Sequence, residues 1–210
     1  MADEVSVEEV KHRLKRKLLA KMITGKTRRI HITGAAGAGV TTLGHGLADA
    51  LAIPHHDTDD YYWRPTNPPY REARAVRDRL RLMKMFLDQP DWVLSGSFDS
   101  WGDPITPLFD LVVFLYTGTN VRLKRLRARE TERFGAEAAA PGGWWHEEME
   151  NFIEWVSHYD DGSREGRTLA RHHAWLATVP CPVLHLKGTR PLPDLIKEIS
   201  AAIERGAASS

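Results

Sequence analysis

Residues 34–44 read GAAGAGVTTLG, and this stretch decides the fold of the chain. An apolar segment at residues 30–33 leads directly into the first glycine, and a helical pattern begins after the last threonine. A strand, a glycine-rich loop and a helix in this order are typical of a phosphate-binding loop. The glycines let backbone N–H groups converge on phosphate oxygens, and the helix N-terminus adds partial positive charge. The residues expected to bind nucleotide here are Gly34, Ala35, Ala36, Gly37, Ala38, Gly39, Val40, Thr41 and Thr42.

One position departs from the phosphate-loop pattern GxxxxGK[ST], because Val40 stands where the pattern has lysine. Thr41 occupies the position whose hydroxyl binds magnesium. Losing one preorganised donor costs on the order of 10²–10³ in rate, although backbone amides and magnesium still bind nucleotide without it. Two other interpretations stay open. The spacing GxxGxG also suggests a dinucleotide fold, whose acidic residue lies about 20 residues further on, and the glycines could form a purely structural turn.

Short apolar segments alternate with helix-length periodic segments along the chain. Strands are expected at residues 30–33, 53–56, 92–95, 111–116 and 183–186, and helices at residues 43–51, 73–87, 121–133, 145–159 and 192–203. Strands separated by helices predict a parallel sheet covered on both faces, which is an α/β fold. Residues 135–143 (GAEAAAPGG) have the weakest pattern and are expected to form a mobile loop.

The same patterns give the domain boundaries. Residues 1–27 are expected to hold one amphipathic helix, because apolar residues recur there every three or four positions. These residues are Val7, Val10, Leu14, Leu18 and Met22. The helix either packs on the flank of the domain or contacts another protein. Residues 28–206 form the expected α/β domain, and residues 207–210 form a tail.

The composition of the 210 residues excludes several classes of protein. With 42% hydrophobic and 27% charged residues, the chain is not disordered throughout, and no apolar segment reaches the roughly 18 residues that cross a membrane. Residues 1–30 carry nine Lys and Arg against four acids, a charge of +5, so the net charge of +1 leaves −4 on the rest. This balance argues against a nucleic-acid surface. We expect a cytoplasmic protein, because the first residues, MADEVSVEEV, do not form a secretory signal.

Two carboxylates follow the second expected strand, in the sequence HHDTDD at residues 55–60. The carboxyl ends of the strands form the ligand crevice of an open parallel sheet, so Asp57 and Asp59 are expected beside the phosphate-binding loop. One acid of such a pair can orient magnesium and its water while the other accepts a substrate hydroxyl. An ordinary acidic turn is the alternative. The candidate substrate contacts after the third strand are Ser95, Ser97 and Asp99.

Arginines dominate the segment after the fourth expected strand. Arg122, Arg125 and Arg129 fall on one helical face, and arginines at the carboxyl edge of the sheet suit bidentate contacts to phosphate. A solvated basic face is the alternative. Further cations follow, and we expect one of them to replace the lysine that is missing at position 40. The candidates are Arg164, Arg167 and Arg171.

With these motifs the chain resembles the adenylate kinase and shikimate kinase branch of the P-loop kinases, and more closely a bacterial adenylate-kinase-like group often labelled AAA family ATPase. The resemblance covers about residues 28–205 and implies a sheet of strand order 2-3-1-4-5 with a lid at about residues 121–172. It rests on GAAGAGVTTLG (34–44), HHDTDDYYW (55–63), WVLSGSFDSWGDP (92–104), DLVVFLYTGTNVRLKRLRARE (110–130) and VLHLKGTRP (183–191).

The resemblance also implies roles for the residues that match family motifs. Asp57 and Asp59 match an acidic pair used for magnesium and for a hydroxyl-bearing acceptor, and Arg125 and Arg129 match lid arginines that contact ATP. Residues 188–191, which include Arg190, match the loop that borders adenine.

Two features depart from the nucleotide kinases within this branch. Ser95 stands where they often carry an aspartate, which makes Asp57, with Thr41, the expected holder of magnesium. The acceptor sequence DGFPR of adenylate kinases is absent, so AMP is not the expected acceptor.

The leading hypothesis is a kinase that transfers the γ-phosphate of ATP to a small hydroxyl-bearing acceptor, with Mg²⁺ as cofactor. Its expected catalytic residues are Asp57, Asp59, Arg125, Arg129 and Arg167. The alternative, which Val40 favours, is a nucleotide-binding regulatory protein or slow ATPase with little transfer activity. A dinucleotide-dependent enzyme and a nucleic-acid binder fit the sequence less well. The expected partners are a nucleotide and a small acceptor, and no membrane.

Overall fold

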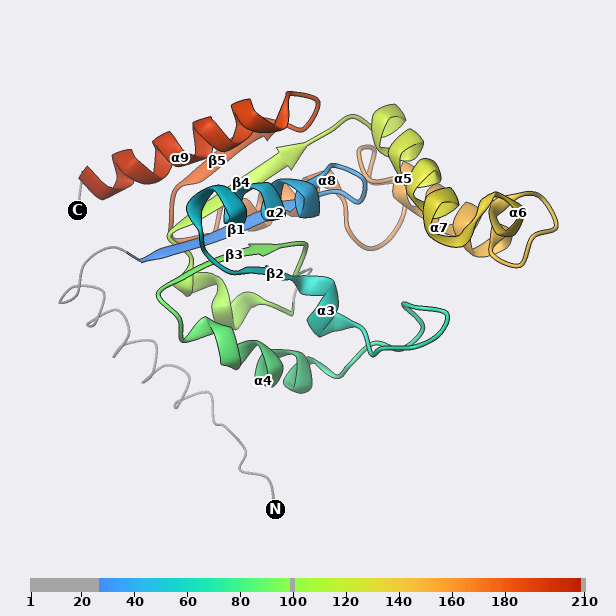
Figure 1. The fold of residues 1–210 in the computed structure, drawn as a ribbon, viewed down its shortest axis with the longest axis horizontal. Helices are drawn as coiled ribbons and strands as arrows, with labels where there is room; N and C mark the ends of the chain where they lie inside the picture. The colour runs from blue at the N-terminus through green and yellow to red at the C-terminus, as the bar shows by residue number, and fades with distance from the viewer. Residues whose placement is uncertain (1–26, 99–100, 209–210) are drawn as a thin grey trace, which may run out of the picture.

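The computed structural model describes residues 27–98 and 101–208. Within these ranges one sheet contains β1 (Arg28–Gly34), β2 (His55–Asp57), β3 (Asp91–Ser95), β4 (Leu111–Tyr116) and β5 (Val183–Lys187). Each neighbouring pair is parallel, and the strands lie in the order β2-β3-β1-β4-β5 (Figure 1). The expected α/β class and the strand order 2-3-1-4-5 are confirmed.

Helices connect these strands. They are α2 (Val40–Leu51), α3 (Thr58–Tyr62), α4 (Val76–Leu87), α5 (Thr119–Phe134), α6 (Ala136–Ala139), α7 (His146–Ser157), α8 (Leu169–Leu176) and α9 (Leu192–Ala208), with the 3₁₀ helix η1 (Asp103–Leu108). All five helices expected within residues 28–206 are present, with ends shifted by a few residues. The short elements α3, α6, α8 and η1 were not expected.

The alternation of β1 sends its side chains to two different layers. Ile30 and Ile32 are at most 1% exposed and pack in the core with α2 and α9. His31 and Thr33 point to the opposite face, because successive side chains of a strand alternate. Ile32 and Asp57 both pair with Ser95 in the register of the sheet. The ends of β1, β2 and β3 therefore meet at one edge, directly before the glycine-rich loop.

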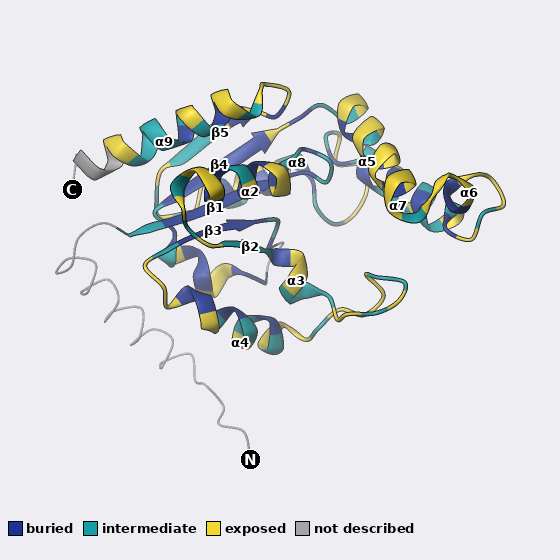
Figure 2. Ribbon diagram, in the orientation of Figure 1, coloured by how far each residue is buried: buried dark blue, intermediate teal, exposed yellow. Residues whose placement is uncertain are grey.

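Each face of the sheet is covered by helices, as the alternating pattern predicted. One core lies under α2 and α9 and includes Leu43, Leu47 and Ile199. The other lies under α4, α8 and η1 and is rich in aromatic side chains, such as Trp92 and Phe114. Figure 2 shows the strands buried between helices whose outer faces are exposed.

Helices α5, α6 and α7 form a separate lobe that projects beyond the sheet (Figure 1). It has its own small core, in which Leu126 of α5 packs with Trp145 and with Ile153 of α7. Residues 136–139 form α6 inside the segment expected to be a loop, and Ala138 and Ala139 are buried in this core. The loop expectation was wrong there because the alanine-rich sequence AEAA favours a helical turn, and the lobe buries Ala138 and Ala139.

The expected amphipathic helix at residues 7–22 lies outside the described residues, as does Asp99. Among the helices of the described chain, none is long and apolar enough to cross a membrane.

Candidate active site

The glycine-rich loop between β1 and α2 has the backbone that phosphate binding requires. Gly37 and Gly39 adopt φ angles of 78° and 99°, which side-chain-bearing residues rarely adopt. Helix α2 begins at Val40, directly after Gly39, which has no side chain to cap the helix. The N–H groups of this first turn, with their partial positive charge, are therefore oriented to receive an anion.

Val40 supplies packing to this loop and no charge. Its side chain is 8% exposed and belongs to the core that contains Leu43 and Leu115. Its Cγ2 atom lies 3.1 Å from the position that a Cβ would take at Gly34. Any cation that serves the phosphates must therefore come from another element.

A chain of hydrogen bonds joins the start of α2 to the end of β2. The Thr41 hydroxyl donates to Asp57 Oδ2 at 2.8 Å, and the Ser95 hydroxyl donates to the same oxygen at 3.2 Å. Ser95 Oγ accepts in turn from His55 Nε2 at 2.9 Å. The two residues expected to hold magnesium thus lie side by side. Ser95 is fully buried and donates to Asp57, so in this structure it positions that carboxylate. A direct contact of Ser95 with substrate stays a prediction.

The oxygen atoms of Thr41 and Asp57 fit a magnesium ion. Hydroxyl and carboxylate oxygens are the hard ligands that Mg²⁺ prefers, and this ion usually takes one or two protein ligands beside water and substrate phosphates. Thr41 is exposed, so the pair is open to the loop. Across residues 27–98 and 101–208, no group of three or more His, Cys, Asp or Glu is placed to hold a metal.

Asp59 lies in the first turn of α3, next to this pair. Its backbone N–H donates to Asp57 Oδ1 at 3.0 Å, so that Asp57 also caps α3. Loss of hydration, together with the charge of Asp57, raises the pKa of Asp59 to about 6, while Arg167 and Arg129 act in the opposite direction. The Asp59 side chain is nevertheless exposed to solvent. A carboxyl group that titrates near neutral pH is suited to exchange a proton with a hydroxyl.

Arg125 reaches over the glycine-rich loop from α5. Its Nη1 donates to the carbonyl oxygen of Ala38 at 3.2 Å, and its Nη2 donates to that of Gly188 at 3.0 Å. The guanidinium therefore joins the loop to the segment after β5. The structure brings this predicted residue to the loop, as the spacing of the arginines suggested.

Arg122 does not share the exposed face of Arg125. It is 0% exposed, and its guanidinium donates to the carbonyl oxygens of Thr117 and Val156 and forms an ion pair with Asp160 at 3.3 Å. The expected row of three phosphate-binding arginines was therefore wrong at this position. The spacing of Arg122 also matches Leu126, which is buried one turn further on. Arg122 joins α5 to the end of α7.

Replacing Arg122 with methionine is expected to lower the free energy of unfolding by about 3–5 kcal/mol, because breaking a buried ion pair leaves its partners without compensation. The matched control is Arg127→Met on the same helix. Arg127 is exposed and pairs with Glu150, and such surface pairs contribute about 0–1 kcal/mol. Urea unfolding of both variants checks this difference. Equal losses in the two variants would contradict the structural role of Arg122.

The other predicted arginines take different positions. Arg129 pairs with Glu130 at 2.6 Å, and its charge acts on Asp59. Arg190 pairs with Glu198 of α9 at 2.6 Å, and Arg164 pairs with Glu154 of α7. These ion pairs hold Arg190 against α9 and Arg164 against α7.

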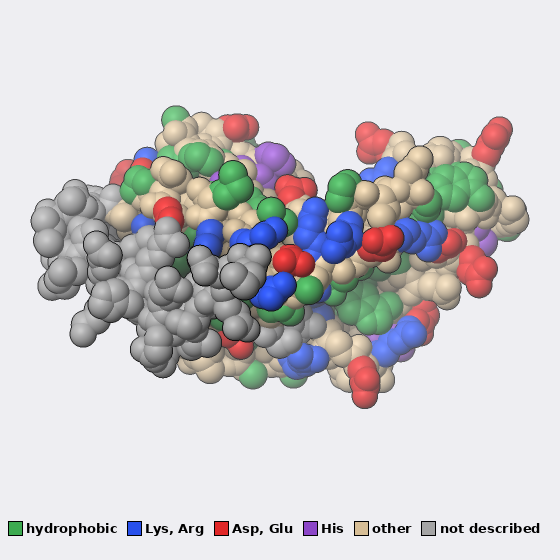
Figure 3. Space-filling model, turned by 90° about the horizontal axis from the view of Figure 1, so that it is seen from below, with side chains coloured by type: hydrophobic (Ala, Val, Ile, Leu, Met, Phe, Trp, Pro, Cys, Tyr) green, Lys and Arg blue, Asp and Glu red, His purple; other side chains and the backbone are tan. Residues whose placement is uncertain are grey.

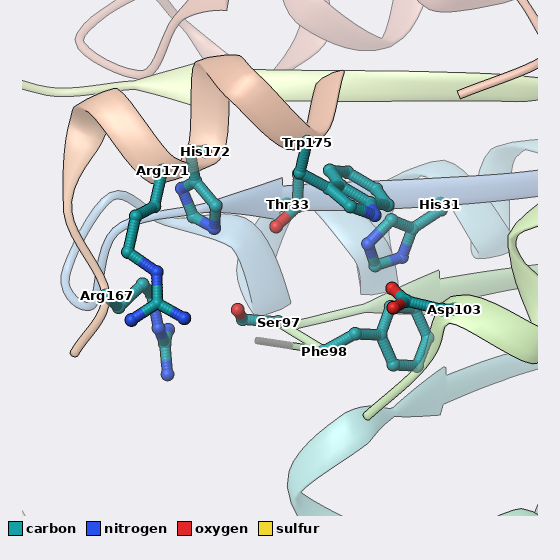
Figure 4. A pocket seen from close by; sticks show the side chains of 9 residues that line it. All are labelled: His31, Thr33, Ser97, Phe98, Asp103, Arg167, Arg171, His172 and Trp175. Atoms are coloured by element: carbon teal, nitrogen blue, oxygen red, sulfur yellow. The ribbon is translucent and has the colours of Figure 1, made fainter. Parts of the chain in front are cut away.

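A cavity of about 210 Å³ opens beside these groups, between the ends of β1 and β3 and helix α8. We call it the α8 cavity. Figure 4 shows Arg167 and Arg171 at one end and His31 and Asp103 at the other, with Ser97 between them. Of the three candidate replacements for the missing lysine, Arg167 is the one whose charge acts on Asp59.

The loop between α3 and α4 reaches across to the lobe of α5–α7. Arg71 forms an ion pair with Glu148 at 2.7 Å and stands over the Trp145 ring at 5.5 Å. Arg133 of α5 stands over the Tyr70 ring at 5.2 Å. Figure 3 shows Lys and Arg side chains gathered along the middle of one face of the molecule, with acidic side chains among them. The contacts of Arg71 and Arg133 join this loop to the lobe.

Sequence reasoning missed His31, His172 and Trp175, which line the α8 cavity. His172 shares a hydrogen bond of 2.6 Å between its Nδ1 and the Tyr159 hydroxyl, and burial lowers its pKa to about 4. The sequence feature that could have indicated this cavity is the single histidine in the strand RRIHITG. The histidine lines a cavity only because α8, more than 130 residues further along the chain, packs beside it.

Comparison with known proteins places the chain in a family. No protein-family model matches it. The protein named "Uncharacterized protein YqaC" of Bacillus subtilis (strain 168) is 42% identical over 161 residues, which cover 76% of this chain and 88% of YqaC. The chain belongs to the YqaC family. The name of this relative states no activity, so the site must be interpreted from its geometry.

Solved structures similar to this YqaC-family chain identify its fold. A shikimate kinase from Acinetobacter baumannii in complex with shikimate has a TM-score of 0.52 at 18% identity, covering 88% of this chain and 97% of that one. A shikimate kinase from Bacteroides thetaiotaomicron has a TM-score of 0.51 at 17% identity, covering 85% and 99%. A gluconokinase from Sinorhizobium meliloti 1021 has a TM-score of 0.50 at 17% identity, covering 88% and 96%. The fold is that of the P-loop kinases, as the sequence motifs predicted.

Proposed function

We propose that this chain is an ATP-dependent phosphotransferase that moves the γ-phosphate of ATP to a hydroxyl of a small acceptor. The observation that carries the proposal is the hydrogen bond between Thr41 and Asp57 at the mouth of the glycine-rich loop, with Asp59 in the adjoining helix turn. A phosphate-binding backbone, a pair of metal ligands and a proton acceptor then share one crevice, which is the set of parts that phosphoryl transfer needs. The P-loop kinase fold supports the same function.

Each group has a separate role in this proposal. The backbone of residues 34–42 binds the phosphates of ATP, while Thr41 and Asp57 hold Mg²⁺, which would neutralise charge on the phosphate oxygens when bound. Asp59 orients the acceptor hydroxyl and takes its proton. Arg167 and Arg129, whose charges both act on Asp59, stabilise the negative charge that develops during transfer.

The remaining predicted residues belong to the nucleotide end of the site. Arg125 holds the loop at Ala38 against Gly188, and Arg190 in the same segment borders the adenine ring. Residues 28–206 act as one catalytic domain, with a lid at about residues 121–172. Residues 1–27 contact another protein or the flank of this domain, and the enzyme works in the cytoplasm, where ATP is available.

A second candidate function rests on Val40. Because its side chain packs in the core and supplies no charge, the site lacks the cation that P-loop kinases place at this position. A nucleotide-binding regulatory protein or slow ATPase would have the same loop and the same Thr41–Asp57 pair. The two candidates differ in the fate of the γ-phosphate.

A transfer assay separates the two candidates. The protein is incubated with γ-labelled ATP, Mg²⁺ and a panel of hydroxyl-bearing acids and polyols, beginning with shikimate and gluconate because of the fold neighbours. Label that appears on an acceptor only when Mg²⁺ is present supports the phosphotransferase. Label released only as inorganic phosphate supports the slow ATPase.

Val40→Lys is expected to raise the rate of phosphate transfer at least tenfold, because it restores a preorganised cation whose loss costs on the order of 10²–10³ in comparable sites. Val40→Met is the matched control, since methionine resembles the lysine side chain in length and carries no charge. Steady-state rates at saturating ATP check the prediction. Equal rates in the two variants would contradict it and indicate that another cation already fills that space.

A further inference from the structure

Two buried polar atoms at the α8 cavity have no hydrogen-bond partner in the described part of the chain: His31 Nε2 and Ser97 Oγ. The other nitrogen of the His31 ring, Nδ1, lies 2.9 Å from the carbonyl oxygen of Leu94. Because a carbonyl oxygen can only accept, Nδ1 carries the proton and Nε2 presents a lone pair. His31 is therefore a fixed hydrogen-bond acceptor at the inner wall of the cavity.

The surroundings of His31 keep it in this state. The ring is 0% exposed, stacks on Phe109 at 4.9 Å and lies 4.8 Å from the ring of Phe98. Burial lowers its pKa to about 3, so the ring is neutral at physiological pH. Native structures rarely leave buried acceptors unpaired, and an unpaired one requires an explanation. A group that donates to Nε2 supplies that explanation.

The two ends of the cavity differ in chemistry. Arg167 and Arg171 place positive charge at one end (Figure 4), and the charge of Arg167 also acts on Asp59. At the other end stand two groups that can accept hydrogen bonds, His31 Nε2 and the Asp103 carboxylate. The volume of about 210 Å³ lies below the roughly 300–1,000 Å³ typical of pockets for drug-sized ligands. The cavity therefore suits a small molecule with an anionic group at one end and a hydrogen-bond donor at the other.

We propose that the α8 cavity holds the phosphoryl acceptor and that His31 selects it, accepting a hydrogen bond at Nε2 from a hydroxyl or ammonium group of a small anion. The anionic group of this molecule lies at Arg167 and Arg171. The role of this molecule as phosphoryl acceptor rests on the proposed phosphotransferase. Its binding in the α8 cavity does not. Trp175, which is only partly buried, lies edge-on to the His31 ring at 5.9 Å and lines the same cavity.

Three matched probes test this proposal by calorimetry without ATP or Mg²⁺. They are cyclohexanecarboxylate, trans-4-hydroxycyclohexanecarboxylate and trans-4-aminocyclohexanecarboxylate, which share the anionic group and differ at position 4, where the third acid also carries a positive charge. The wild-type protein is expected to bind one of the two donor-bearing acids about 3- to 10-fold more tightly than the plain acid, the range of one net hydrogen bond. The preferred donor, hydroxyl or ammonium, identifies the acceptor class.

Variants assign this preference to His31. His31→Phe keeps an aromatic ring without an acceptor and is expected to reduce the preference to what Asp103 alone supplies, whereas His31→Gln offers an amide oxygen and is expected to retain more of it. Arg171→Gln is expected to weaken all three acids by the same factor, because it removes charge at the shared anionic end. The glutamine variant and the wild-type titrations still test the proposal if the phenylalanine variant does not fold.

Two results would overturn the proposal. The first is equal or undetectable binding of the three acids to the wild-type protein. The second is a donor preference that is as large in His31→Phe as in the wild-type protein. Because the titrations contain no nucleotide, either result is independent of the transfer assay. A failed transfer assay with intact donor preference would instead remove the proposed phosphotransferase and leave a small-anion binding site.

Discussion

Aspartate in place of Gly39 is expected to weaken the binding of MgATP more than 100-fold. Gly39 has a φ angle of 99° and directly precedes the first turn of α2. A carboxylate at this position would accept hydrogen bonds from the N–H groups that otherwise bind the phosphates. Its negative charge would also repel the phosphates of ATP. Calorimetric titration of Gly39→Asp and of the wild-type protein with MgATP measures the effect.

Gly39→Asn is the matched control, because asparagine has the size of aspartate, no charge, and a tolerance for left-handed backbone. A Cβ at this position would meet Arg125 Nη1 at 3.6 Å and Leu115 Cδ2 at 3.8 Å, which are ordinary contact distances. Asparagine is therefore expected to reduce affinity much less than aspartate does. Binding of MgATP to the aspartate variant at wild-type affinity would contradict the assignment of this loop.

The fold could be predicted because its long helices have periodic apolar residues and its buried strands are continuous apolar runs. Residues 111–116 (LVVFLY) form β4 with the expected bounds. This strand is buried on both faces, so its sequence is a continuous apolar run. Helix α8, with the sequence LARHHAWL, has too few turns to show a period of 3.6 residues. Short elements of this kind depend on tertiary packing, which local sequence does not reveal.

The candidate site could be predicted for residues that have a suitable functional group and directly follow or end a strand of the sheet. Thr41 follows the loop and Asp57 ends a strand at the same edge of the sheet, so parallel topology alone brings them together. Arg122 shows the limit of this reasoning. Spacing places it on the same face as Arg125 at i+3 and as Leu126 at i+4, and only packing against α7 decides that the face is buried.

Asn in place of Asp59 is expected to lower the rate of phosphate transfer at least 100-fold, while MgATP affinity stays within about threefold. General base catalysis contributes about 10²–10⁴, and Asp59 is the carboxyl group with a pKa raised to about 6, by loss of hydration first and by Asp57 second. The carboxylate is the active form, so wild-type transfer rises with pH through about 6 and then levels. The variant lacks this rise. A pH–rate profile of the two proteins measures it.

Asp60→Asn is the matched control in the same helix turn. Asp60 raises the pKa of Asp59, so removing its charge is expected to move the midpoint of the wild-type profile slightly to lower pH and to leave the plateau unchanged. A transfer rate that is lost at high pH in Asp60→Asn and is fully kept in Asp59→Asn would contradict the proposed base. It would indicate Asp60 as the base instead.

Stability provides an independent check on the same carboxyl group. Between about pH 4 and pH 6 the folded protein keeps a proton on Asp59 that the unfolded chain has released, because the folded pKa is raised from 3.8 to about 6. Stability from this group is therefore present at low pH and lost as pH rises through 6. Asp59→Asn escapes this loss, so its melting temperature at pH 8 should equal or exceed that of the wild-type protein. If Asp59 is the catalytic base, its ionised form lowers stability and supports transfer, so Asp59→Asn changes both. If Asp59 belongs to an ordinary acidic turn, the substitution changes neither the pH–rate profile nor the melting temperature.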